Sequence, residues 1–266
     1  MRLLVFTAAT FGIGSNMVVD DAQPVPLKGA ITNLNWFDAQ RKHYETPDQI
    51  ARRFKLPDDD AMRAFCHGAA SMLDRRTAQF IRRVPGTPDD AWCFLADTGK
   101  ARQWLFGVEW DFRPGGAFRL PKAGAGVAAR GLIAELHPDE VLELAAEDGS
   151  TVRFEALNAT GTAPARRDIP NYAGAITEFR VTNRVPETAG APERLRDTTA
   201  EQIAQPGGPG THRVGVVAAW HRAASLLQKL AFEEANQFWS PEQAIGLDLE
   251  ALVAAYSKLM PAYYKA

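Results

Sequence analysis

The chain has 266 residues, with 30 Lys and Arg against 32 Asp and Glu, so its formal net charge is −2 at pH 7. Hydrophobic residues make up 46% of the sequence, a typical value for a globular protein that excludes a disordered or low-complexity chain. The charge balance gives no basic footprint of a nucleic-acid-binding protein. The two cysteines, Cys66 and Cys93, exclude a disulfide scaffold and a cysteine-based zinc site.

Near the start of the chain, Arg2 is followed by a short run of apolar residues. This run is too short to span a bilayer, which takes about 20 apolar residues, so we expect no transmembrane segment. A signal peptide would begin in this way, but no Ala-x-Ala site follows and Gly12 and Gly14 interrupt the run. We expect residues 3–6 to form a buried strand of a cytoplasmic protein, with export as the alternative if residues 1–20 act as a signal peptide.

Residues 46–75 are predicted to form a helical hairpin. Thr46 is a suitable N-cap with proline at the first helical position, and Leu56-Pro57 ends this helix. Apolar residues then recur at helical spacing up to Leu73, as in a half-buried helix.

The pattern changes to strands from Thr77. Residues 77–84 alternate between apolar and polar side chains as in a strand. Thr87 is a suitable N-cap for a helix, and a second short helix follows at about residues 99–105. Further strands are predicted at residues 108–112, 117–120, 127–136, 141–146, 151–157 and 175–181. Tight turns between consecutive strands indicate an antiparallel sheet.

A long helix is predicted at residues 211–238, and a last helix at 248–260. The apolar positions of the long helix, Val216, Trp220, Ala223, Leu227 and Leu230, alternate between spacings of four and three. The order of elements predicts an α+β fold in which the long helix covers the apolar face of the sheet.

Two segments carry a family resemblance. Residues 84–92 (Val-Pro-Gly-Thr-Pro-Asp-Asp-Ala-Trp) resemble the opening of a START-like (SRPBCC) domain. The hairpin at 113–118 (Arg-Pro-Gly-Gly-Ala-Phe) and the run at 131–136 resemble a branch similar to the C-terminal domain of the heat-shock-protein ATPase activator. Over residues 77–238 the resemblance implies a helix-grip fold, in which a curved antiparallel sheet wraps around a long C-terminal helix and encloses a hydrophobic cavity.

This resemblance divides the chain into three parts. Residues 77–238 are expected to form the helix-grip domain. Residues 1–76 are a partly helical N-terminal extension, interpreted as a lid or a partner segment, and residues 239–266 are a helical C-terminal extension.

The polar residues give no catalytic constellation. None of the five histidines has metal-ligand spacing, so we expect no metal and no cofactor. Successive residues of an α-helix are rotated by about 100°, so His221 is expected on the flank or surface of the long helix, away from the apolar stripe that contains Trp220. Cys66 and Cys93 are both expected to be buried structural thiols. Glu109 and Asp111 are expected to face solvent; the alternative places them inside, paired with Arg119.

Aromatic residues form the candidate site because they fall on faces that point at the gap between sheet and helix. Plain core packing is the other interpretation for each of them. The candidates for a ligand cavity are Trp104, Trp110, Phe118, Phe154, Phe179 and Trp220.

The leading hypothesis is that this cavity binds a hydrophobic or aromatic small molecule. One alternative is a co-chaperone-like module that contacts a chaperone, which the family resemblance alone implies. Another is a cyclase, aromatase or hydrolase-type enzyme that uses the same cavity. The sequence does not indicate the oligomeric state.

Overall fold

The computed structural model describes residues 68–74, 76–121, 129–162, 165, 168–169, 171–186, 211–239 and 246–265. The predictions for residues 3–6, for the helices that begin at Thr46 and for Cys66 lie outside the described residues. No helix in the described ranges is both long and apolar enough to cross a membrane.

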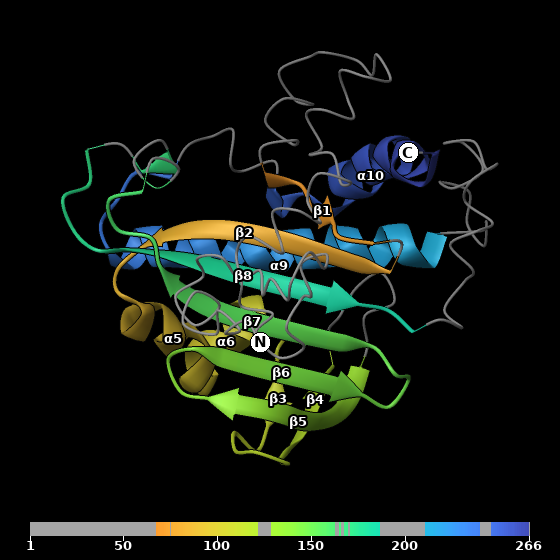
Figure 1. Ribbon diagram of the computed structural model, residues 1–266, viewed down its shortest axis with the longest axis horizontal. Coiled ribbons are helices and arrows are strands. Elements are labelled where there is room, and N and C mark those ends of the chain that lie inside the picture. Colours follow the sequence, from red (N-terminus) through yellow and green to blue (C-terminus); the bar gives the residue numbers. More distant parts are fainter. Residues whose placement is uncertain are drawn as a thin grey trace, which may run out of the picture. The chain divides into compact units, whose positions relative to one another are not determined.

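The eight described strands form one curved, unclosed antiparallel sheet (Figure 1). Its order is β1-β2-β8-β7-β6-β5-β4-β3, so each strand from β3 to β8 pairs with its neighbour in sequence and β8 returns to pair with β2. The strands are β1 (Ser71–Met72), β2 (Thr77–Pro85), β3 (Glu109–Trp110), β4 (Ala117–Leu120), β5 (Ala129–His137), β6 (Val141–Ala146), β7 (Thr151–Asn158) and β8 (Ile176–Arg184).

Helices lie at the ends and on one face of this sheet. The short helices α5 (Pro88–Ala96) and α6 (Thr98–Trp104) connect β2 to β3. The long helix α9 (Thr211–Glu234) runs along β2, and α10 (Leu249–Lys265) packs on α9 (Figure 1). This arrangement confirms the predicted α+β helix-grip fold.

Local sequence explains why these elements begin where they do. In β2, Phe80, Arg82 and Val84 are buried while Ile81 and Arg83 are half-buried, as a period of two requires. The start of α5 is a capping box. The Asp90 backbone N–H donates to the Thr87 hydroxyl at 3.2 Å, and the Thr87 backbone N–H donates to the Asp90 carboxylate at 2.8 Å.

The Pro-Gly-Gly hairpin is shaped by backbone contacts. Gly115 has a φ of +74°, and its N–H donates to the Ile133 carbonyl at 2.9 Å. A Cβ on Gly116 would lie 1.9 Å from the Asp111 carbonyl oxygen, closer than any side chain permits. This motif therefore has a structural role: it lets the hairpin close on β5.

Three predictions about local structure are wrong. The helix expected to reach Leu73 ends earlier, because Ser71–Met72 pair with the edge of β2 as β1. The long helix ends at Glu234 instead of 238. Cys93 is exposed, because α5 buries its neighbours Trp92 and Phe94 and turns the thiol to solvent.

Helix α9 is anchored by buried polar side chains as well as by apolar packing. Ser225 accepts from Arg82 Nη2 of β2 at 3.1 Å, and Gln228 Nε2 donates to the Arg83 carbonyl at 3.0 Å. On the other side, His221 Nδ1 lies 3.0 Å from the Tyr256 hydroxyl of α10. The helix is therefore held by β2 and by α10 together.

The prediction that His221 lies on a flank or at the surface is wrong, because its side chain is 2% exposed. Helical spacing indicates only the face of α9 that packs on the sheet, whereas α10 covers a second face, on which His221 lies. Burial, with a smaller contribution from the charge of Arg82, holds the pKa of His221 well below its usual value. The imidazole is therefore neutral at pH 7.

We predict that Gly116→Ala lowers the free energy of unfolding by about 2–3 kcal/mol, because the new Cβ displaces the backbone at Asp111. Gly115→Ala is the matched control. Its site is open, and it costs only about 1–2 kcal/mol for the positive φ. Urea unfolding of both variants measures the difference. Equal losses would contradict the close-approach argument.

We also predict that the stability depends on the protonation of His221. Below about pH 6.5 the unfolded imidazole takes up a proton that the folded one does not, so the free energy of unfolding falls as the pH falls. The slope approaches about 1.4 kcal/mol per pH unit. His221→Asn removes this contribution, and the exposed control His137→Asn keeps it. Urea unfolding between pH 7.5 and 5.5 tests this, and a wild-type slope in His221→Asn would contradict it.

Candidate functional site

A pocket lies between the inner face of the sheet and the first half of α9. About 510 Å³ of space free of protein atoms lies in and at the mouth of this open pocket, open solvent included. Most of its wall is apolar, and three polar residues join it. Its described lining consists of Phe118, Leu120, Ala129, Leu144, Ala146, Asp148, Ser150, Val152, Asn183, Val185, Pro186, Val216 and Trp220.

The periodicities of strand and helix bring these side chains together. Phe118 and Leu120 are two apart on β4 and both point inward, while Ala117 and Arg119 are exposed. Leu144 of β6 and Val152 of β7 are paired residues in the sheet register and therefore share the inner face. Val216 and Trp220 are four apart on α9 and close the pocket from the helix side.

The polar residues gather at the end of β8 and in the turn between β6 and β7. Asp148 Oδ1 accepts from the backbone N–H and the hydroxyl of Ser150, at 2.8 and 2.6 Å. Asn183 is buried, and its Oδ1 accepts from Arg213 Nη1 of α9 at 3.0 Å. The amide nitrogen of Asn183 donates to the Thr151 carbonyl at 3.3 Å. The pocket therefore combines an apolar wall with a small hydrogen-bonding end.

Two of the six aromatic candidates, Phe118 and Trp220, are among the lining residues. The Trp104 ring packs edge-to-face on Phe154 and Phe179, with centroids 5.7 and 6.0 Å away. These three rings are fully buried, and Trp104 Nε1 donates to the Phe94 carbonyl at 2.8 Å.

The sixth candidate, Trp110, is half-buried against Phe112, at a ring-centroid distance of 5.0 Å. Its Nε1 is buried and has no hydrogen-bond partner among the described residues. The structure thus brings Phe118 and Trp220 to one pocket and places the other four outside its described lining.

Sequence reasoning missed the polar end of the pocket. The predicted strand at 175–181 stopped short of Asn183, whereas β8 continues to Arg184. The inward alternation of Phe179 and Val181, extended by two residues, reaches Asn183 and would have identified it. Asp148 and Ser150 lay in a segment interpreted only as a turn, which carries no signal for a pocket.

A second group of buried polar residues is packed tightly. Arg82, Ser225 and His221 are buried between β2 and α9, and burial lowers the pKa of Arg82 to about 10. A Cβ on Gly246 would lie 2.3 Å from Ser225 Oγ, and one on Gly68 would lie 3.2 Å from His221 Nε2. These backbones leave no room for a substrate, so the group serves as an anchor of α9.

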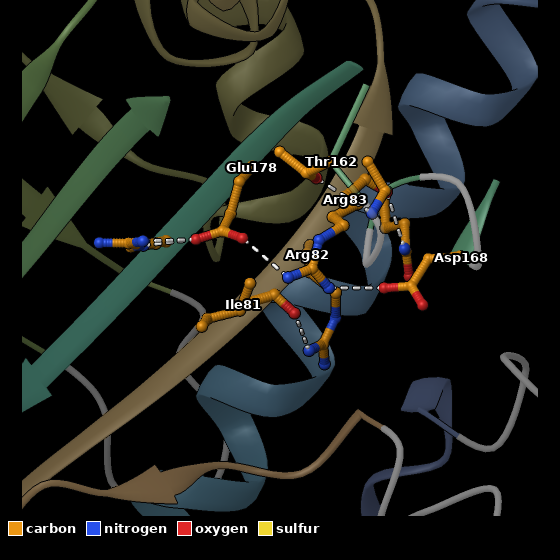
Figure 2. Close-up of polar contacts among 9 residues, drawn as sticks. Ile81, Arg82, Arg83, Thr162, Asp168 and Glu178 are labelled. Carbon is orange, nitrogen blue, oxygen red and sulfur yellow. Dashed lines mark hydrogen bonds and ion pairs between the residues drawn. The ribbon is translucent and has the colours of Figure 1, made fainter. Parts of the chain in front are cut away.

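The neighbouring Arg83 points to the opposite face of the sheet. Figure 2 shows its guanidinium between the carboxylates of Asp168 and Glu178, at 2.6 and 2.8 Å. Glu178 also pairs with Arg180 at 2.6 Å. These half-buried charges neutralise one another and hold the Asp168 carboxylate beside Arg83 of β2, which also pairs with Glu178 of β8.

The remaining charged candidates are at the surface. Glu109 and Arg119 have side chains 53% and 67% exposed and lie 3.9 Å apart, so the expectation that Glu109 faces solvent is confirmed. Asp111 is also exposed and pairs with Arg113 at 2.6 Å. In the described part of the chain, no group of three or more His, Cys, Asp and Glu residues is placed to hold a metal ion.

Comparisons with known proteins give one match to a family model. Residues 85–182 match the family model described as activator of Hsp90 ATPase homolog 1-like protein. No curated protein sequence matches the chain significantly.

Solved structures with a similar chain course include CalU16 from Micromonospora echinospora, at 18% identity over 69% of this chain and 89% of that one, with a TM-score of 0.37. A conserved protein of unknown function, EF2215 from Enterococcus faecalis, is 14% identical over 85% of this chain and 94% of its own, with a TM-score of 0.42. The product of the Bordetella parapertussis gene BPP1335 is 24% identical over 69% and 89%, with a TM-score of 0.36.

These TM-scores are below 0.5, so the fold assignment rests on the sheet and helices of this chain and on the family match. That match covers the capped helix α5, the Pro-Gly-Gly hairpin and most of the sheet, the elements on which the sequence resemblance was based. Residues 85–182 therefore match the model of the activator of Hsp90 ATPase homolog 1-like family, in agreement with the START-like (SRPBCC) resemblance of the sequence.

Proposed function

We propose that the protein binds a small, predominantly apolar molecule in the pocket between the sheet and α9. The observation that carries this proposal is an unfilled space whose described lining is mostly aliphatic and aromatic. The space opens to solvent, and an apolar wall with a few polar groups is the arrangement that small-molecule sites typically have.

The wall of the pocket suits a flat or branched hydrocarbon group. Trp220 is buried and also packs edge-to-face against Phe106, at 5.1 Å between centroids, which fixes its ring on the pocket side. Val216 and Leu144 present branched side chains to the same space. Transfer of apolar area from water to this wall favours binding by about 25 cal/mol per Å².

Binding is favoured over catalysis by the chemistry of the lining. Its described polar residues are one carboxylate, one hydroxyl and one amide, and none is a histidine or a cysteine. The one base that the Ser150 hydroxyl contacts is the carboxylate of Asp148, a weak base in a solvent-exposed pair, and the described lining has no histidine. The neutral His221 belongs to the α9 anchor and is not part of the described lining.

The test is a titration with the neutral fluorophore N-phenyl-1-naphthylamine, which brightens in an apolar environment. We expect saturable binding to the wild type. Val216→Phe fills the pocket and should weaken this binding by at least about tenfold, because a lost 1.4 kcal/mol corresponds to one decade of affinity. Leu132→Phe, at a β5 position that is 54% exposed, is the matched control and should bind as the wild type does.

Thermal unfolding of the three proteins shows whether each variant is folded. Non-saturable fluorescence with the folded wild type would contradict the proposal. Equal affinity of folded Val216→Phe and wild type would place the binding elsewhere and contradict the assignment to this pocket.

A second candidate function is contact with a chaperone ATPase, which only the description of the matching family supports. Among the described residues, the large apolar side chains at the surface are Leu132, Leu157 and Phe238, which lie on β5, on β7 and after α9. A docking surface needs a contiguous patch, so this distribution favours the pocket. Stimulation of the ATPase activity of purified Hsp90 by this chain would support the second candidate.

A further inference from the structure

The orientation of the Asn183 side chain is fixed by its neighbours. Its Oδ1 accepts from Arg213 Nη1 at 3.0 Å, and a flipped amide would bring two N–H donors face to face. The Thr151 carbonyl, 3.3 Å from Nδ2, fixes the same orientation. The amide therefore keeps its oxygen toward Arg213 of α9 and its nitrogen toward the Thr151 carbonyl of the sheet.

The described contacts of this amide use one of its two hydrogens. Nδ2 donates that hydrogen to the Thr151 carbonyl. Asn183 is 3% exposed and is a lining residue of the pocket. A buried donor gains from an acceptor, because bulk water cannot reach it freely.

The charge of Arg213 strengthens this donor. A guanidinium that donates to Oδ1 draws electron density from the amide, and hydrogen bonds in series polarise one another. The other end of Arg213 donates to the Arg76 carbonyl at 2.9 Å, so the guanidinium is held in place before a ligand arrives.

The charges of the pocket limit the kind of acceptor. Its described lining includes Asp148 and contains no lysine, arginine or histidine. A carboxylate buried here would lose its hydration without a basic side chain on the wall, whereas a carbonyl or hydroxyl oxygen loses much less.

We propose that Asn183 is a specificity-determining residue that donates a hydrogen bond from Nδ2 to a neutral carbonyl or hydroxyl oxygen of the bound molecule. This inference rests on the proposed function. The ligand class it names is an apolar ring or chain that carries one neutral oxygen acceptor at the end nearest β8.

The experiment compares two probes of similar shape, naphthalene and 2-acetylnaphthalene, in their displacement of N-phenyl-1-naphthylamine. For the wild type we expect the ketone to bind about fivefold to tenfold more tightly than the hydrocarbon, the size of one net hydrogen bond. Naphthalene-2-carboxylate should bind more weakly than the ketone.

The variant Asn183→Asp removes the hydrogen-bond donor of this side chain while keeping its size and shape. The carboxylate still accepts from Arg213 Nη1 but loses the bond to the Thr151 carbonyl, and its side chain has no hydrogen to donate. Thermal unfolding shows that the variant is folded before its binding is measured. The ratio between ketone and hydrocarbon should fall to about one. Asn158→Asp is the matched control. Asn158 is exposed outside the described lining, and its Oδ1 accepts from the Thr160 backbone, so the ratio should stay at the wild-type value.

The outcomes separate the two proposals. If naphthalene binds but the ketone has no advantage, or if folded Asn183→Asp keeps the advantage, the role of Asn183 is wrong and the binding function stands. If the fluorophore itself does not bind saturably, both proposals are wrong; if it binds but neither probe displaces it, the ligand class assigned through Asn183 is wrong and the binding function stands. Preferred binding of the carboxylate would overturn the assignment of a neutral oxygen.

Discussion

The placement of α9 is the constraint on which the rest of the structure depends. This helix is buried on two sides, by the inner face of the sheet and by α10, and each side adds polar contacts to apolar packing. Hydrogen bonds between buried polar groups are directional, so they fix the rotation of a helix about its axis and its position along that axis more strictly than apolar packing does. The hydrogen bonds that Ser225, Gln228 and His221 of α9 make with β2 and with α10 therefore determine which residues of α9 face the sheet.

The pocket is a consequence of that placement. Because Ser225 and His221 anchor the middle of α9, Val216 and Trp220 face residues of β4, β6 and β7 across the pocket. Part of the space between sheet and helix is filled, because the Phe154 and Phe179 rings pack against Trp104. At the pocket the lining includes the small side chains Ala129, Ala146 and Ser150, and a space stays open. Trp220 contacts both regions, because its ring packs on Phe154 and also lines the pocket.

The sequence predicted the order of the elements and the fold well, because strand and helix periods are local properties. It predicted the site only in part. Alternation shows that Phe118 and Phe154 both point inward, but it does not show whether an inward ring fills the core or borders a space, since that depends on the residues opposite. His221 was misplaced for a related reason: a helical wheel shows one apolar stripe, and the second covered face is created by α10, 35 residues further along the chain. Asn183 was within reach of the same alternation that identified Phe179, had the strand been extended to its true end.

The central claim is that the space beside Trp220 receives a small apolar molecule. Methyl NMR of the protein labelled at Val and Leu, titrated with naphthalene, tests this most directly, because an aromatic ring shifts the methyl groups it lies against. The account predicts saturable shifts of Val216, Leu144 and Val152, and none of Leu132 on the outer face or of Leu142, which is buried outside the described lining. Shifts confined to other methyl groups, or no saturable shift in the folded protein, would contradict it.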